Sequence, residues 1–138
     1  MSESAHRVVI FPATIESIEV VQAEFDAWWT SLGEPSTATR FGFETAVVEI
    51  ATNIVEHTQR AEGTAGRGYT LDLDATASEV TAVFTDNGMP ADIDLSAVTM
   101  ADVEDESGRG LALAIAALDS LDYRHEGGRN IWTLVCRR

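Results

Sequence analysis

Residues 49–57, Glu-Ile-Ala-Thr-Asn-Ile-Val-Glu-His, place a polar side chain at every fourth position. Side chains four residues apart differ by about 40° around a helix, so Glu49, Asn53 and His57 form one polar ridge. The ridge lies beside the apolar stripe of a helix predicted over residues 39–60, where the wall of a cleft would be. The ridge could supply oxygen ligands to a hard cation such as Mg²⁺. Alternatively, Glu49 could accept a proton in catalysis, or the ridge could be a solvated helix flank without a function.

The pattern on either side of this helix predicts an α+β fold. Ile18, Val21, Phe25, Trp28 and Leu32 recur at helical spacing, which indicates an earlier helix over residues 14–32 with Thr14 as its N-cap. The other predicted elements are strands at 7–11, 68–74, 79–85, 121–126 and 129–136, and a buried helix at 111–121. Residues 86–110 are predicted to be mainly a mobile loop, with one turn of helix near residues 94–100. This order favours a two-layer sandwich with helices on one face of a mixed, mostly antiparallel sheet.

A second group of candidate site residues, Asp86-Asn87-Gly88-Met89-Pro90, directly follows a predicted strand. Asp-Asn-Gly is common in plain turns. Alternatively, a carboxylate at a strand end, beside a glycine that permits close approach, could accept a hydrogen bond from an amino group such as that of adenine.

A third group, Ser107-Gly108-Arg109-Gly110-Leu111, leads into the predicted apolar helix. Glycines and the free amides of a helix N-terminus favour phosphate binding, and Arg109 adds a permanent cation. A flexible loop that simply enters a helix would have the same sequence pattern, and the acidic residues before it would repel phosphate.

The three groups together resemble the GHKL-type (Bergerat) ATPase fold shared by gyrase, Hsp90, histidine kinases and MutL. Within that group the chain is most similar to the small anti-sigma factor serine kinases. Glu49-xxx-Asn53-xxx-His57 resembles their N box, Asp86-x-Gly88-x-Pro90 their first glycine box, and Gly108-Arg109-Gly110-Leu111 their second. The likeness covers about residues 8–136, and we expect one domain over 1–138.

The resemblance implies a role for each residue. Glu49 would be the general base, Asn53 would ligate Mg²⁺, and Asp86 would bind the adenine amino group above a pocket floor shaped by Gly88. Further nucleotide-binding positions implied by the resemblance are Pro90, Gly108, Arg109, Gly110, Leu111 and Thr133, the last of them near the adenine. His57 would be structural.

The composition limits the partners. The net charge of −14 disfavours nucleic acid and anionic lipid, and suits solubility or a basic protein partner. All nine basic residues are arginine, so a P-loop lysine is absent. The sequence shows neither an export signal nor an apolar run long enough to span a membrane, and we expect a cytoplasmic protein.

The leading hypothesis is an ATP- and Mg²⁺-dependent serine/threonine kinase that phosphorylates an anti-anti-sigma (STAS-type) regulator and sequesters a sigma factor. Asp105 and Glu106 stand where some such kinases carry a basic residue, so an alternative is a weak or inactive module that only binds nucleotide and a regulator. A metal hydrolase using Glu49 and His57 would lack the HExxH spacing. A histidine-kinase catalytic fragment would need its phosphoacceptor on a separate chain.

A homodimer is also possible, because the first strand would lie at a sheet edge. Trp28 and Trp29 are adjacent in the sequence, and one narrow helical stripe cannot bury both rings. One ring would face a partner or a loop, or both would be covered within the monomer.

Overall fold

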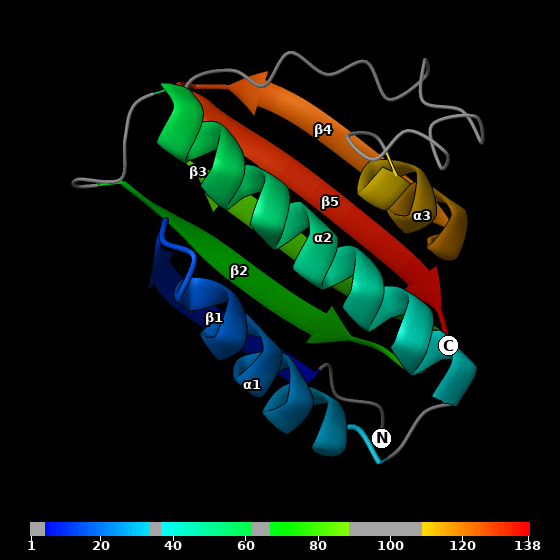
Figure 1. The fold of residues 1–138 in the computed structure, drawn as a ribbon. Helices are drawn as coiled ribbons and strands as arrows, with labels where there is room; N and C mark the ends of the chain where they lie inside the picture. Colours follow the sequence, from blue (N-terminus) through cyan, green and yellow to red (C-terminus); the bar gives the residue numbers. More distant parts are fainter. Residues whose placement is uncertain (1–4, 34–36, 62–66, 89–108) are drawn as a thin grey trace.

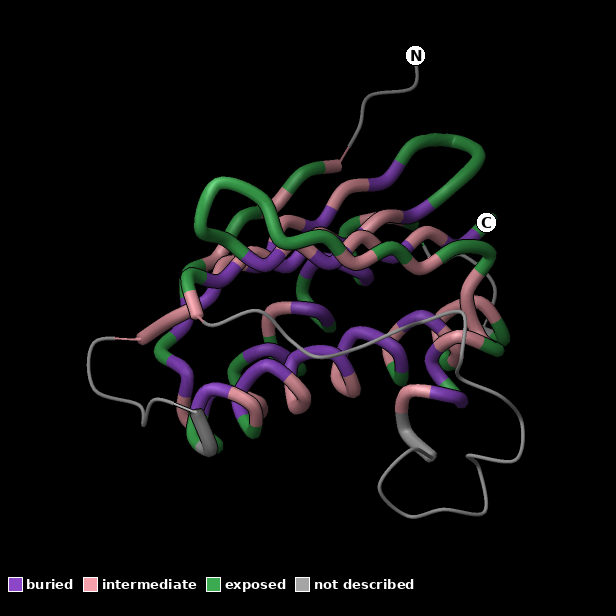
Figure 2. The backbone as a smooth tube through the Cα atoms, turned by 90° about the horizontal axis from the view of Figure 1, so that it is seen from above, coloured by how far each residue is buried: buried purple, intermediate pink, exposed green. Residues whose placement is uncertain are grey.

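The structure, a computed structural model, describes residues 5–33, 37–61, 67–88 and 109–138. It has two layers, with the helices on one face of the sheet and the other face open (Figure 2). The elements are β1 (Ala5–Pro12), α1 (Ser17–Thr30), α2 (Thr37–Ala61), β2 (Gly68–Ala75), β3 (Glu79–Asp86), α3 (Arg109–Ala117), β4 (Ser120–Glu126) and β5 (Arg129–Arg137). The predicted α+β sandwich is confirmed, and the helical turn suggested within 86–110 lies outside the described residues.

The five strands form one sheet in the order β1-β2-β3-β5-β4 (Figure 1). Every described strand pair is antiparallel, so the expected mixed character of the sheet is wrong. In the register of β3 and β5, Phe84 lies opposite Trp132 and Asp86 opposite Asn130. Paired residues share a face, so these four side chains all point toward the helices.

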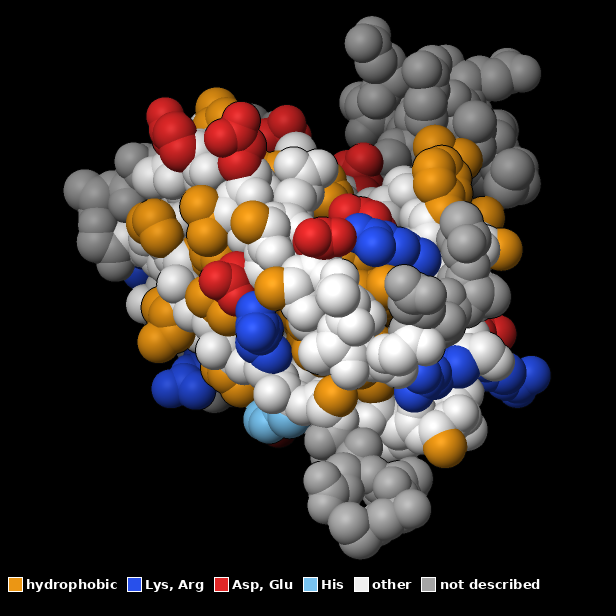
Figure 3. Space-filling view, turned by 90° about the horizontal axis from the view of Figure 1, so that it is seen from below, with side chains coloured by type: hydrophobic (Ala, Val, Ile, Leu, Met, Phe, Trp, Pro, Cys, Tyr) orange, Lys and Arg blue, Asp and Glu red, His pale blue; other side chains and the backbone are white. Residues whose placement is uncertain are grey.

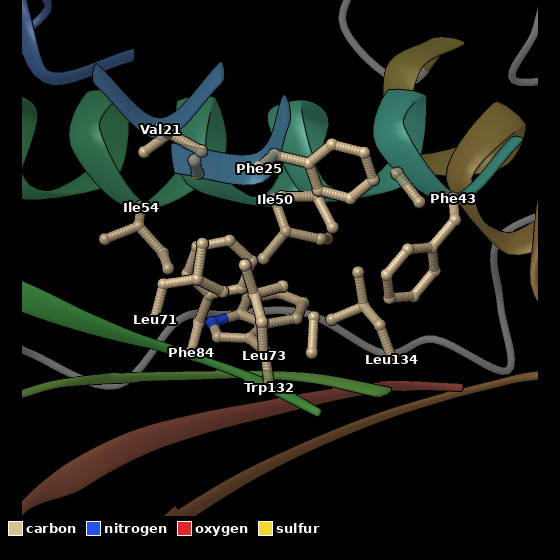
Figure 4. Packing of buried hydrophobic residues seen from close by; sticks show 14 of the residues in the cluster. Val21, Phe25, Phe43, Ile50, Ile54, Leu71, Leu73, Phe84, Trp132 and Leu134 are labelled. Carbon is tan, nitrogen blue, oxygen red and sulfur yellow. The ribbon is translucent and has the colours of Figure 1, made fainter. Parts of the chain in front are cut away.

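Buried side chains from α1, α2 and the inner sheet face form one core (Figure 4). The stripe predicted on α2 is confirmed, because Phe43, Val47, Ile50 and Ile54 are all buried. Since these residues hold one side of α2 against the sheet, the orientation of the polar ridge beside them is set by core packing.

Helix α1 begins later than expected. Its N-cap is Glu16, which makes no side-chain capping hydrogen bond, so the assignment of Thr14 as N-cap is wrong. Residues between β1 and α1 form a tight turn instead, in which Ser17 Oγ donates to the carbonyl oxygen of Thr14 at 2.6 Å. The turn uses the Thr14 main chain, so the helix starts at Ser17.

Both tryptophans of α1 are covered within the monomer, with 2% of Trp28 and 3% of Trp29 exposed. Trp29 stacks on Phe25 at 5.6 Å between ring centroids, and Phe43 of α2 contacts the same cluster. Trp28 Nε1 donates to the carbonyl oxygen of Ala5 at 3.1 Å. The second ring is buried because α2 packs over the side of α1 that a single stripe would leave exposed.

No helix in the described ranges is long and apolar enough to cross a membrane.

Two phenylalanines of α2 provide a matched test of this core. Phe43 is fully buried, whereas 76% of Phe41 is exposed. We expect Phe43→Ala to lower the free energy of unfolding by about 3–5 kcal/mol, the usual cost of deleting a buried ring. Phe41→Ala should change it by no more than about 0.5 kcal/mol. Urea unfolding followed by circular dichroism measures the free energy of unfolding of both variants. Equal decreases in the two variants would contradict the placement of α2.

Candidate functional site

A buried carboxylate occupies the end of β3. Asp86 is 7% exposed, and its Oδ1 accepts hydrogen bonds from the main-chain N–H of Gly88 at 2.8 Å and from Asn130 Nδ2 at 2.9 Å. Asn130 is only 1% exposed, and its Nδ2 also lies 3.4 Å from the carbonyl oxygen of Gly88. The Asp-Asn-Gly turn is therefore tied to the first inward position of β5.

The amide orientation of Asn130 follows from its neighbours. A carboxylate can only accept hydrogen bonds, so the amide nitrogen must face Asp86. The amide oxygen then faces β4, where Tyr123 Oη donates to it and His125 Nδ1 lies 3.0 Å away. Tyr123 is held in turn by Trp132, with 4.6 Å between ring centroids. Asn130 links β4, β5 and the turn after β3.

The two carboxylate oxygens of Asp86 differ in their hydrogen bonds. No described residue donates to Oδ2, whereas Oδ1 accepts two hydrogen bonds. Asp86 also lines a pocket at the strand ends. A fixed carboxylate with one oxygen that accepts from no described residue is suited to accept a hydrogen bond from an amino group.

The polar ridge of α2 lies at the same end of the molecule. Glu49, Asn53 and His57 are all half-buried. The C-terminal half of α2 lies near the end of β3 and the start of β5 (Figure 1). Burial raises the pKa of Glu49 above its usual 4.5, and the nearby charge of Glu56 raises it further. A carboxylate with a raised pKa is a better proton acceptor than an exposed one.

Helix α3 begins at Arg109, within the second glycine segment, and packs against α2. Arg109 and Gly110 form its first positions, and Leu111 packs against the core. The two helices approach closely at Gly42, where an added Cβ would lie 3.4 Å from Ala117 Cβ. The free amides of the first turn of α3 carry the positive end of its dipole.

Not every predicted site residue joins this arrangement. Pro90 and Gly108 lie outside the described residues. Thr133 pairs with Val83, on the opposite sheet face from Asp86, so the structure does not bring these two predicted site residues together. The reason is the two-residue period of a strand, by which odd-numbered residues of β5 point away from the helices.

Asn130 is a residue of this cluster that was not among the predicted site residues. The sequence does mark Asn130, because it is a polar residue in a strand otherwise rich in apolar side chains. Its alternation with Trp132 and Leu134 would have placed it on the buried face.

Two pockets lined by described residues touch the candidate residues. One, of about 280 Å³, opens at the strand ends and is lined by Asp86 and Arg129 among others, but not by α2. The other, of about 370 Å³, lies between α1 and α2, where Gln22, Phe41 and Glu49 contribute to its walls. Glu49 is therefore accessible from the outer side of the helix layer.

Several solved structures share this fold, and two of them are compared here. The RsbU and RsbW domains of Rv1364c from Mycobacterium tuberculosis match with a TM-score of 0.64 and 21% identity. The match covers 96% of this chain and 32% of that chain, so the present sequence spans about a third of that protein's length. The SiaB–SiaC complex of Pseudomonas aeruginosa matches with a TM-score of 0.64 and 13% identity, over 96% of this chain and 89% of that chain.

No curated protein matches the sequence. The family model of the histidine kinase-like ATPase domain does match, over residues 11–136. That range includes α2, the Asp86 turn, the second glycine segment and Asn130. On this evidence the chain belongs to the histidine kinase-like ATPase domain family.

Proposed function

We propose that this chain is a cytoplasmic, single-domain anti-sigma factor that binds Mg·ATP and phosphorylates a serine or threonine of an anti-anti-sigma, STAS-type regulator. The observation that carries the proposal is the Asp86 carboxylate, in which Gly88 and Asn130 hold one oxygen and no described residue donates to the other. Family membership supports nucleotide binding, because this family is one of ATPase domains.

The adenine would bind at the turn after β3. Its 6-amino group would donate to Asp86 Oδ2, with Gly88 and Pro90 forming the adjacent pocket wall. The phosphates would lie at the start of α3, held by the amides around Gly108, Gly110 and Leu111. Arg109 would add charge where no lysine is available.

Magnesium would be held by few protein ligands. The described residues contain no group of three or more His, Cys, Asp or Glu side chains that could hold a metal ion. Mg²⁺ commonly uses one or two protein oxygens and completes its shell with phosphate and water, which fits a single carboxamide from Asn53. The bound ion would neutralise phosphate charge.

Glu49 would act as the base in the transfer. The acceptor hydroxyl oxygen would bond to the γ-phosphorus as the bond from that phosphorus to the bridging oxygen breaks, and its proton would pass to a Glu49 carboxylate oxygen. ADP would leave. Access to Glu49 from the pocket between α1 and α2 supports approach by a protein side chain. The remainder of catalysis would come from positioning and charge neutralisation.

A regulator and a sigma factor are the proposed partners. The net charge of −14 suits partners with basic surfaces. SiaB, which has the same fold, is solved in complex with SiaC, so this fold is able to hold a protein partner.

A second candidate function is a module that binds nucleotide and sequesters a regulator without transferring phosphate. The observation that favours it is the acidic pair Asp105 and Glu106, directly ahead of the second glycine segment. Incubation of the chain with labelled ATP and a STAS-type regulator separates the two functions. Label on the regulator supports the kinase, whereas a stable complex without label supports the module.

Asp86→Asn tests the adenine contact. The new amide can still accept from Gly88 and Asn130 through its oxygen, but it turns an NH₂ group toward the ligand's amino group. We expect the Kd for ADP, measured by calorimetry, to rise about 10- to 100-fold, because a hydrogen bond to a charged group contributes about 1.5–3 kcal/mol.

Thr133→Val is the matched control, since Thr133 lies on the open sheet face. Its Kd for ADP should equal that of the unmodified chain. If Thr133→Val bound ADP more weakly while Asp86→Asn bound it as the unmodified chain does, the assignment of Asp86 to adenine would be overturned.

Glu49→Gln separates catalysis from binding and stability. Phosphate transfer should be lost while ATP affinity is kept.

A carboxyl whose pKa is raised by folding stabilises the protein below about pH 4.5, and that stability is lost as pH rises through the folded pKa. Thermal unfolding should therefore show Glu49→Gln to be at least as stable as the unmodified chain at pH 7.

Glu56→Gln, on the same helix, is the control variant for Glu49→Gln. Removal of the Glu56 charge lowers the pKa of Glu49, so the acidic limb of the pH–rate profile should move to lower pH. Full transfer by Glu49→Gln, or an acidic limb that does not move in Glu56→Gln, would argue against Glu49 as the base.

A further inference from the structure

Strand β4 carries different side chains on its two faces. Its charged residues lie on the open face and pair with one another, with 3.3 Å between Arg124 and Glu126. On the helix side, Tyr123 and His125 both contact the amide oxygen of Asn130. The proposed transfer of phosphate uses neither of these two side chains, so their contact with Asn130 calls for another explanation.

The turn between β4 and β5 brings these side chains to Asn130. Gly127 and Gly128 form that turn with φ values of 61° and 76°, a geometry that suits a two-residue hairpin and fixes its register. His125 is then directly opposite Asn130, and Tyr123 is the diagonal neighbour, within reach of a long side chain. The backbone of the hairpin therefore places a phenol hydroxyl at the Asn130 amide.

Tyr123 is the firmer of the two partners of this amide oxygen. Asn130 is 1% exposed, so an amide oxygen left without a donor would be costly. Tyr123 is half-buried, and its ring lies 4.6 Å from that of Trp132 between centroids. His125 is exposed, and Nδ1 of a neutral imidazole donates in only one of its two tautomers. The hydroxyl of Tyr123 is thus the donor that packing holds in place.

The contacts continue from Asn130 to the carboxylate of Asp86. With its oxygen held by Tyr123, the Asn130 amide directs Nδ2 to Asp86 Oδ1 at 2.9 Å. The same oxygen accepts from the main-chain N–H of Gly88 at 2.8 Å. Two donors on one oxygen restrain the rotation of the carboxylate, so they also set the direction of Oδ2. That direction therefore depends on a hydroxyl from another strand.

We propose that Tyr123 is a positioning residue for base selection, which holds Asn130 so that Asp86 presents Oδ2 to position 6 of a purine in one fixed direction. The inference rests on the proposed adenine contact and deepens it. Tyr123 does not touch the base in this arrangement, because it acts through the amide of Asn130.

A fixed carboxylate oxygen selects between purines by the group at position 6. Adenine carries an amino group there, which donates to the oxygen. Hypoxanthine carries an oxygen, which a carboxylate oxygen repels, and a site built for one hydrogen-bond polarity rejects the other. A carboxylate that turns more freely loses part of the contact with adenine and relieves part of the repulsion of hypoxanthine. Tyr123 therefore affects the ratio of the two affinities.

Tyr123→Phe tests this role, because it removes the hydroxyl and keeps the ring that contacts Trp132. Calorimetry with Mg²⁺ measures the Kd of ADP and of inosine diphosphate, whose base is hypoxanthine. The unmodified chain should bind ADP at least about 10-fold more tightly than inosine diphosphate. In Tyr123→Phe this preference should fall about 3- to 10-fold, the range for the loss of one neutral hydrogen bond.

Asn130→Ala tests whether the effect passes through the amide. This variant should also prefer ADP less than the unmodified chain does. Addition of Tyr123→Phe to Asn130→Ala should cause no further change in the preference. A role of Tyr123 confined to stability would instead lower both affinities, and it would do so equally in either background.

Glu24→Ala is the distant control. It also removes one hydrogen bond, the 2.8 Å contact between Arg7 of β1 and Glu24 of α1, but at the opposite edge of the sheet from β4. Figure 3 views the molecule from that side, where acidic and basic side chains lie among hydrophobic ones. The preference of Glu24→Ala for ADP should equal that of the unmodified chain.

Two outcomes would overturn the inference, and they differ in what they say of the adenine contact. If the unmodified chain prefers ADP and Tyr123→Phe prefers it equally, the role of Tyr123 is wrong and the adenine contact stands. If the unmodified chain binds ADP and inosine diphosphate equally, both proposals are wrong.

Discussion

Water solvates a carboxylate strongly, so a carboxylate buried at the end of a sheet needs hydrogen bonds to replace that water. At Asp86 the replacement comes from the Gly88 main chain and the Asn130 amide, both on one oxygen. This arrangement fixes the turn after β3 and leaves the second oxygen without a donor among the described residues. The nucleotide proposal depends on this asymmetry, because a carboxylate satisfied on both oxygens would have none left to accept from an adenine amino group.

The strands that hold this carboxylate also define the face on which the site can form. Asp86 is the last inward-facing residue of β3 and Asn130 is the first inward-facing residue of β5, at the end of the sheet where the apolar core ends. Helix α2 lies across the same face, held by a buried stripe that leaves Glu49 and Asn53 half-buried beside it. Core packing and site geometry therefore share one set of constraints, and a change of register would disrupt both.

Much of this arrangement could be predicted from the sequence. Hydrophobic periodicity located all three helices and five strands, because each element buries one face in a single core. Asp86 was found because strand ends followed by Asp-x-Gly are recognisable turns. Glu49 and Asn53 were found from helical spacing, and the structure places them half-buried beside the core.

Features that depend on register or on neighbouring elements could not be predicted in the same way. Thr133 was predicted to lie near the adenine, and Asn130 was not among the predicted site residues. The structure places them on opposite sheet faces, because a shift of one residue along β5 exchanges the two faces. Thr14 is a good N-cap residue by type, but its main chain is used by a turn. The burial of Trp29 required Phe43, which comes from another helix.

A crystal structure of the chain with Mg·ADP tests the central claim most directly. We expect the adenine 6-amino group about 3 Å from Asp86 Oδ2, with Gly88 and Asn130 still bonded to Oδ1. Adenine bound away from Asp86, or with Oδ2 turned to a protein donor and no contact to the base, would contradict it.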